Sequence, residues 1–160
     1  MRVNLEKALG FILEDEGGYA ERPTEPGGAV NFGISMTTFS SWRSMHSRPR
    51  PAFADLKAMS KDEAIAIYTM NYALPLHFEN IPAGLDYAAL DAAVNEGVDA
   101  ARGLLTVTTP LRDMKARIQA ISDIRLTVKK ARPEWTKFGP GWTARINDRV
   151  VKRAVLLGNL

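Results

Sequence analysis

An acidic run ends the first apolar stretch of the chain, and a glycine pair follows it at once: Glu14, Asp15 and Glu16, then Gly17 and Gly18. The apolar residues before this run recur at helical spacing, at Leu5, Leu9 and Ile12. Extending that stripe by four residues reaches Glu16. Glu16 is therefore predicted to lie on the apolar face, at the last turn of a helix over residues 3–16, and its two acidic neighbours to face solvent.

Glu16 has the setting of a general acid. Apolar surroundings, the negative end of the helix dipole and a neighbouring acid all disfavour an ionised carboxyl at that position. A second carboxylate, Glu25, follows in a loop whose Pro26-Gly27-Gly28 turn can fold it back toward Glu16. An acid and a carboxylate on either side of a cleft are the minimum set for hydrolysis of a glycosidic bond. The alternative is that Glu16 is an interface residue that binds a backbone group or an arginine.

The remaining pattern predicts a mainly helical protein. Helices are expected over residues 37–45, over 60–72 behind a Ser60/Glu63 capping box, up to Gly97, from about Leu111 to Pro133, and along Trp142, Ile146, Val150 and Ala154. Asp99 is placed to cap the helix after Gly97. Residues 19–35 lack helical periodicity and are predicted to form a turn-rich loop or small hairpin. No linker divides the chain, so residues 1–160 are expected to form a single domain, with residues 85–160 helical and basic.

Composition excludes several classes of site. Cysteine is absent, which excludes disulfides, thiol nucleophiles and cysteine-ligated zinc. With two histidines and no His-Glu-x-x-His motif, neither a metal nor a cofactor is expected. Glu6 and Lys7 interrupt the apolar stretch that a signal peptide would need. We therefore expect no signal in this stretch that directs export.

Charge is distributed unevenly along the chain. Residues 1–111 carry 9 Lys/Arg and 14 Asp/Glu, a net charge of −5, whereas residues 112–160 carry 12 and 4, a net charge of +8. A basic C-terminal third suggests an anionic partner surface, such as nucleic acid, lipopolysaccharide or a wall polymer. The alternative is a solvated helical face.

Two sequence blocks carry a family resemblance. E-G-G-Y at 16–19 and E-P-G-G-A-V-N-F-G-I at 25–34 resemble the signature of glycoside hydrolase family 108, which comprises small phage endolysins and bacterial N-acetylmuramidases. Residues 81–105 are similar to the D-x-x-V-N-x-G segment of that family, and residues 138–146 resemble its closing G-W-x-x-R. The resemblance therefore extends over most of the chain, in the order of the family.

The resemblance implies a lysozyme-like fold with a small loop or hairpin region beside the cleft. It implies a monomeric peptidoglycan hydrolase that cuts the β-1,4 bond between N-acetylmuramic acid and N-acetylglucosamine, without nucleic acid as a partner. Such a protein without an export signal is expected to be made in the bacterial cytoplasm and to reach the wall through a holin-type pore, another secretion route or delivery in a particle. Glu16 would be the catalytic acid and Glu25 the second catalytic carboxylate. The expected substrate-binding residues are Tyr19, Asn31 and Phe32 of the cleft loop, with Tyr72 at a helix end and Asn95. Asp91 and Asn95 lie four residues apart on one helix face, and we interpret them structurally: Asn95 bonds backbone near the cleft and Asp91 fixes a neighbouring element.

This chain departs from the family pattern in the cleft loop. The family usually has Asp where Glu25 stands and Thr where Val30 stands, and in related phage lysozymes these two groups help to hold the attacking water. Val30 has the shape of Thr but no hydroxyl, which leaves Asn31 or Ser35 as substitutes. We expect a working or weakened enzyme. The alternatives are a wall-binding or particle-structural protein that kept the fold and lost the chemistry, or a nucleic-acid binder.

Overall fold

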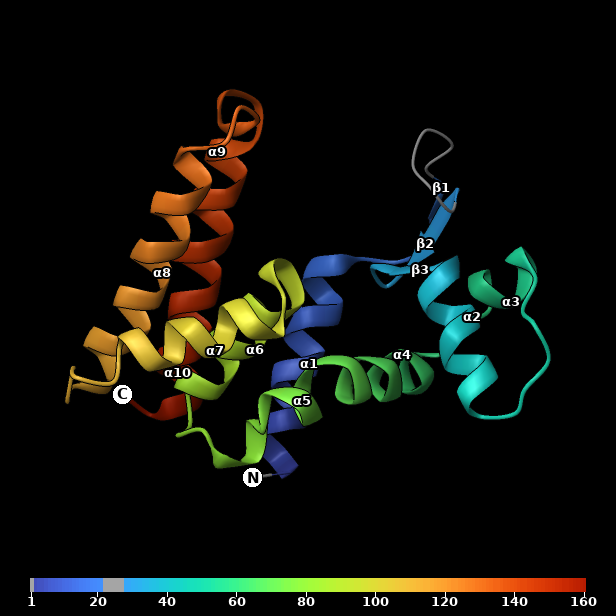
Figure 1. The fold of residues 1–160 in the computed structure, drawn as a ribbon, viewed down its shortest axis with the longest axis horizontal. Coiled ribbons are helices and arrows are strands. Elements are labelled where there is room, and N and C mark those ends of the chain that lie inside the picture. Colours follow the sequence, from blue (N-terminus) through green and yellow to red (C-terminus); the bar gives the residue numbers. More distant parts are fainter. Residues whose placement is uncertain (1, 22–27) are drawn as a thin grey trace. The chain divides into compact units, whose positions relative to one another are not determined.

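The computed structural model describes residues 2–21 and 28–160, and it is mainly helical with one small sheet (Figure 1). The chain separates into two compact units. One comprises Glu6–Asn71, and the other comprises Tyr72–Leu160 together with the first residues up to Leu5. The predicted fold class, mainly α with a hairpin region, is confirmed. Within the described part of the chain, no helix has both the length and the apolar character that crossing a membrane requires.

Helix α1 (Arg2–Glu16) follows the predicted boundaries closely. Its apolar face is buried at Ala8, Leu9, Ile12 and Leu13. The helix ends at Gly17, which adopts a left-handed φ of +74° and donates its backbone N–H to the Leu13 carbonyl at 3.1 Å. Glu16 therefore occupies the last helical position, as the stripe predicted.

A three-stranded antiparallel sheet occupies the segment predicted as a loop or hairpin. Its strands β1 (Ala20–Glu21), β2 (Ala29–Asn31) and β3 (Ile34–Ser35) lie in the order β1-β2-β3. Asn31 pairs with Ile34, so two residues alone connect β2 to β3. These residues, Phe32 and Gly33, have φ of +49° and +73°, which is the conformation of the tight turns favoured in two-residue hairpins.

Three further helices complete this unit: α2 (Met36–Met45), α3 (Phe53–Lys57) and α4 (Lys61–Tyr68). The hydroxyls of Ser35 and Ser60 cap α2 and α4 by accepting the backbone N–H groups of Thr38 and Glu63. Their buried side chains are Phe39, Trp42, Leu56, Ala64, Ile67 and Tyr68. A π-helical segment, η1 (Thr69–Ala73), continues α4, so the helix predicted through Tyr72 is present.

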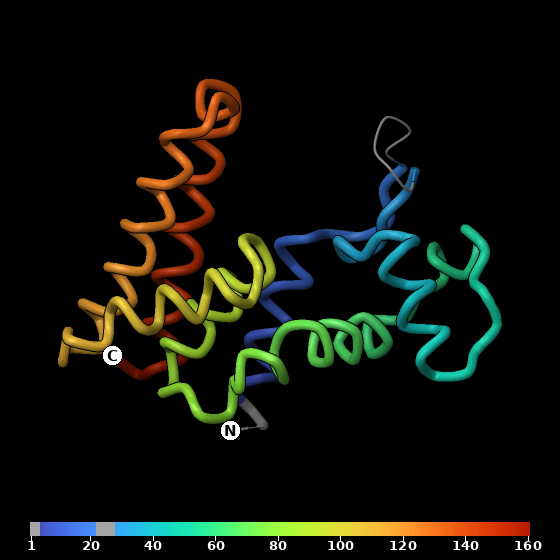
Figure 2. Tube along the Cα trace, viewed as in Figure 1, coloured from blue at the N-terminus to red at the C-terminus, as the bar shows by residue number. Residues whose placement is uncertain are grey.

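The second unit is built around α6 (Leu85–Glu96), whose residues from Leu85 to Ala93 are all buried. Two short elements precede it, α5 (Leu74–Leu76) and η2 (Phe78–Asn80), and α7 (Val98–Val107) follows it. Helix α8 (Met114–Lys130) is followed by three consecutive helical segments, α9 (Trp135–Thr143), η3 (Ala144–Val151) and α10 (Lys152–Gly158). These segments pack antiparallel along α8 (Figure 2). The predicted C-terminal stripe is buried at Ile146, Val150 and Ala154.

The prediction that Asp99 caps α7 is wrong. Gly97, with φ of +98°, occupies the N-cap position, and α7 starts at Val98 without a side-chain cap. Asp99 instead pairs with Arg102 at 3.1 Å, one turn further along the same helix.

Candidate active site

The Glu16 carboxyl lies directly against the β2–β3 turn. Its side chain is half-buried at the end of α1. A Cβ atom placed on Gly33 would lie 2.8 Å from Glu16 Oε2 and 3.1 Å from Glu16 Cβ. Such distances are shorter than van der Waals contact, so a side chain at this position would displace the Glu16 carboxyl. Glycine at position 33 thus meets two needs, the left-handed turn and the room for the Glu16 carboxyl.

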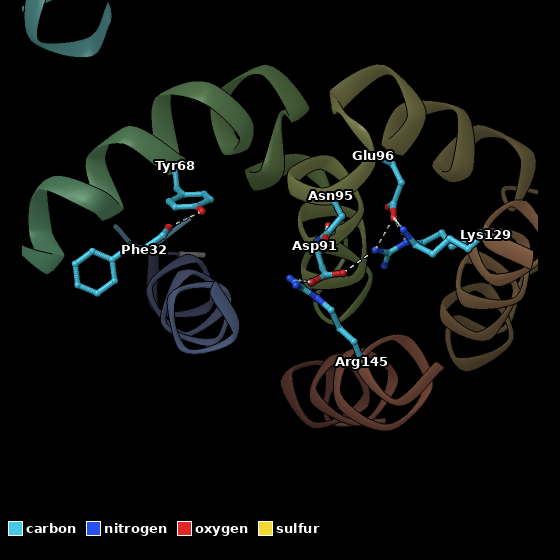
Figure 3. Close-up of polar contacts among 8 residues, drawn as sticks. Phe32, Tyr68, Asp91, Asn95, Glu96, Lys129 and Arg145 are labelled. Atoms are coloured by element: carbon cyan, nitrogen blue, oxygen red, sulfur yellow. Dashed lines mark hydrogen bonds and ion pairs between the residues drawn. The ribbon is translucent and has the colours of Figure 1, made fainter. Parts of the chain in front are cut away.

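Tyr68 fixes the same turn from α4. Its hydroxyl donates to the Phe32 carbonyl at 2.8 Å, and its side chain is 3% exposed. Figure 3 shows this hydroxyl pointing at the carbonyl, with the Phe32 ring extending away from Tyr68. The same Cβ on Gly33 would lie 2.8 Å from Tyr68 Oη. A partly buried hydrogen bond therefore holds the backbone of Phe32, a non-glycine residue at positive φ, beside the Glu16 carboxyl.

Asn31 anchors the hairpin to α3. Its Nδ2 donates to the Leu56 carbonyl at 2.9 Å and to the Lys57 carbonyl at 3.2 Å, and Asn31 is 4% exposed. The amide nitrogen is thus engaged within the fold, and a contact from Asn31 to substrate stays a prediction. Phe32 is half-buried at the turn itself.

Val30 lies at the centre of the sheet, half-buried and opposite Ala20 on β1 and Ser35 on β3. Strand alternation turns its side chain to the face opposite that of Asn31. The two residues proposed to replace the missing hydroxyl both have structural bonds: Asn31 holds α3, and Ser35 Oγ accepts the Thr38 N–H at 3.2 Å. The hydroxyl of the family threonine is thus absent at Val30, and the Asn31 amide nitrogen and the Ser35 hydroxyl both take part in structural hydrogen bonds.

Tyr19 stands between the end of α1 and β1. Its hydroxyl donates to Glu21 Oε1 at 3.4 Å, and the Lys57 ammonium lies 5.3 Å from the centre of its ring. Desolvation, and then the charge of Glu21 and the hydrogen bond to it, raise the pKa of the Tyr19 phenol. The ring is half-buried, and its contact with substrate stays a prediction.

The second predicted catalytic carboxylate, Glu25, lies outside the described residues. The two acids beside Glu16 differ from each other: Glu14 is exposed, as predicted, whereas Asp15 is half-buried. Within residues 2–21 and 28–160, no group of three or more His, Asp or Glu side chains is arranged to hold a metal ion.

The other two predicted substrate-binding residues belong to the second unit. Tyr72 lies in η1 and is half-buried. Asn95, near the end of α6, donates its Nδ2 to the Asp91 carbonyl at 2.8 Å, which is the backbone bond predicted for it. For both residues, contact with substrate stays a prediction.

Asp91 fixes neighbouring elements, as predicted. It is fully buried, and its two oxygens accept from Arg125 at 2.8 Å and Arg145 at 3.2 Å (Figure 3). Glu96 extends the cluster by binding Arg125 and Lys129, each at 2.8 Å. Asp91 belongs to the segment that resembles D-x-x-V-N-x-G, and Arg145 is the arginine of the segment that resembles G-W-x-x-R. A single ion pair thus joins the two C-terminal motifs across 54 positions of sequence.

The sequence pattern did not predict the role of Tyr68. The residue is buried, but its hydroxyl holds the turn. A tyrosine on a buried stripe needs a partner for its hydroxyl, and this is the signal that distinguishes it from phenylalanine. The family motif contains Gly33, but its contact with Glu16 is visible only in three dimensions.

A helix-terminal carboxyl set against a fixed glycine turn, in a mainly helical protein with a small sheet, is the arrangement of a lysozyme-like glycosidase. Comparison with known proteins supports this class. The family model for glycosyl hydrolase 108 matches residues 9–97, so the chain belongs to glycosyl hydrolase family 108. The solved structure of Brucella abortus SagA is similar over 100% of this chain and 98% of that one, with 31% identity and a TM-score of 0.81. Comparison with curated proteins finds none that matches. The protein is a peptidoglycan hydrolase of the lysozyme-like kind.

Proposed function

We propose that the protein is an N-acetylmuramidase, which hydrolyses the β-1,4 bond between N-acetylmuramic acid and N-acetylglucosamine. Glu16 protonates the glycosidic oxygen as the bond breaks. The observation that carries the proposal is the packing of Glu16 against Gly33, where a Cβ would come within 2.8 Å of Oε2. Proton transfer needs an acid held in one position, and the hairpin turn supplies a rigid wall for it.

Glu25 completes the proposed pair. Its carboxylate stabilises the oxocarbenium-like transition state or positions the attacking water. The separation between the two carboxyls sets the stereochemical course, because an inverting enzyme needs room for a water between carboxylate and sugar. The Tyr68 bond to Phe32 keeps the turn in place during this step, so Tyr68 acts as a positioning residue.

Product analysis tests the proposed bond. Purified sacculi are digested with the protein, and the new reducing ends are reduced with borohydride. We expect muramic acid to be converted to its alditol, because cleavage after N-acetylmuramic acid leaves that sugar at the reducing end. Formation of glucosamine alditol instead would assign the other glycosidic bond and contradict the proposal.

Val30 favours a second candidate, a weakened hydrolase that serves in wall binding or as part of a particle. Both neighbours that might supply the missing hydroxyl are bonded elsewhere. The candidates differ in a turbidity assay on chloroform-treated Gram-negative cells, which a working muramidase clears and a wall-binding protein does not.

We also propose that the basic C-terminal third contacts an anionic wall or outer-membrane surface. Three exposed cations of this third lie near the end of α8 and the start of α9, Lys130, Arg132 and Lys137, whereas Lys129 is mostly buried in its pair with Glu96. Neutralising the three exposed residues should weaken binding to wall preparations more at low salt than at high salt. Equal loss at both ionic strengths would contradict a screened attraction. Such a surface suits an endolysin that reaches the wall after release from the cytoplasm.

A further inference from the structure

A hydroxyl-lined groove runs along the solvent side of α2. Four hydroxyl residues repeat there at helical spacing: Thr37, Ser40, Ser41 and Ser44. Phe39 and Trp42, on the opposite face, are buried. The groove has a volume of about 690 Å³, and Arg48 and Arg50 complete its wall. This volume is in the range of small-molecule and ligand sites.

The groove carries excess positive charge. Arg43 and Arg48 share one carboxylate, Glu63, at 3.2 and 3.6 Å. Arg50 is exposed, and no carboxylate among residues 2–21 and 28–160 pairs with it. The nearby Asp55 is engaged in capping α3, where it accepts the Ala52 N–H at 2.7 Å. Of the two arginines that line the groove, Arg48 shares Glu63 with Arg43, which is outside the lining, and Arg50 carries the charge that an anionic ligand would meet.

The groove continues toward the hairpin that holds the turn against Glu16. A second hollow of about 510 Å³ shares Thr37, Ser40 and Arg50 with the first. It extends to Gly28, just before β2, and to Phe53, whose side chain is 55% exposed. Figure 2 shows the segment between α2 and α3, which carries Arg48 and Arg50, looping out beside α2. The two hollows thus form one surface from the arginines to the base of the hairpin, and the part nearest the hairpin is lined mainly by apolar residues.

We propose that this groove binds the stem peptide of peptidoglycan, an inference that rests on the proposed muramidase function. The glycan backbone of peptidoglycan is uncharged, and the free carboxylates of the polymer belong to its stem peptides. Guanidinium groups bind carboxylates through paired charge-assisted hydrogen bonds. The hydroxyls of the groove suit the amide N–H and C=O groups of an extended peptide. The groove therefore selects glycan that still carries its peptides.

The test measures binding in a Glu16→Gln background, so that the substrate is not consumed. The two probes are intact purified sacculi and glycan strands from which an amidase has removed the peptides. The amidase leaves a free lactyl carboxylate on each muramic acid, and these carboxylates are converted to amides so that the stripped glycan is uncharged. Arg50→Gln removes the charge of the Arg50 guanidinium, and Arg50→Glu reverses it. Lys61→Gln, at an exposed position of α4 in the same unit, is the matched control for loss of one positive charge. Melting temperatures verify that all variants fold.

We expect Arg50→Gln to weaken binding to intact sacculi by about fivefold and Arg50→Glu by more, since one guanidinium–carboxylate contact is lost or made repulsive. Binding to stripped glycan and the behaviour of Lys61→Gln should not change. Equal losses on both probes, or no loss on intact sacculi, would overturn the proposal. Cleavage by the protein with Glu16 intact is scored separately, so failure of the muramidase assignment is distinguished from failure of the groove.

Discussion

Replacing Gly33 by alanine is the perturbation whose effect follows most directly from the structure. The new Cβ would lie 2.8 Å from both Glu16 Oε2 and Tyr68 Oη, and ordinary contact begins at 3.4 Å. At least one of the two groups must therefore move by more than half an ångström. The ends of side chains move more easily than backbone, so Glu16 should swing away from the turn. A misplacement of roughly 1 Å can reduce turnover about a hundredfold, and we expect a loss of about tenfold to a hundredfold.

The same substitution also has a backbone cost. Gly33 has a φ of +73°, and an L-residue in the left-handed region is disfavoured by about 1–2 kcal/mol. For a protein of this size, that cost corresponds to a fall in melting temperature of roughly 2–8 °C.

Gly17→Ala is the matched control. Gly17 has a similar φ of +74°, but its Cβ would meet no described atom within 4 Å. Both variants should therefore lose comparable stability, and only Gly33→Ala should lose turnover. The assay is the initial rate of sacculus digestion at a temperature where both variants are folded. If the two variants have the same turnover, the contact between Gly33 and Glu16 does not position the acid, and this account of the turn is refuted.

Three further predictions follow from the same units. Tyr68→Phe removes the hydrogen bond to Phe32 and should lower turnover about tenfold. It also removes the Tyr68 hydroxyl, one of the two groups that a Cβ on Gly33 would meet. The double variant with Gly33→Ala should therefore lose less activation free energy than the sum of the two single losses. Val30→Thr should raise turnover several-fold at unchanged substrate affinity, since it supplies a hydroxyl for the attacking water; unchanged or lower turnover would show that other groups place the water. Asp91→Asn breaks a buried ion pair, but Arg125 keeps its bond to Glu96, so we expect the free energy of unfolding to fall by about 3 kcal/mol and the melting temperature by roughly 6–12 °C. A stability equal to that of the parent would contradict the role of this cluster.

Local spacing was enough to predict the position of the acid. The stripe of α1 continues to Glu16 at the same four-residue step, and a glycine pair ends the helix where the pattern predicts. The hairpin was predictable as a region, because glycine and proline interrupt helical periodicity there. Its register was not, since three very short strands carry too little alternation to define pairing.

What the sequence did not predict depends on contacts between distant residues. The bond from Tyr68 to Phe32 spans 36 positions, and the pair between Asp91 and Arg145 spans 54. No periodicity relates such positions, because helical and strand patterns describe only which face of one element is apolar. The wrong prediction at Asp99 has a different cause. Gly97 and Asp99 are both residues that can precede a helix, and Gly97 occupies the N-cap position of α7 in a backbone conformation that favours glycine.

Glu16→Gln tests the central claim most directly. Glutamine has nearly the shape of glutamate and fits against Gly33, but it has no proton to donate to the glycosidic oxygen. The measurement compares the rate of sacculus digestion and the melting temperature of Glu16→Gln with those of the parent protein. The rate should fall by orders of magnitude, and the melting temperature should stay the same or rise. A Glu16→Gln protein that keeps most of its turnover would contradict the assignment of Glu16 as the catalytic acid.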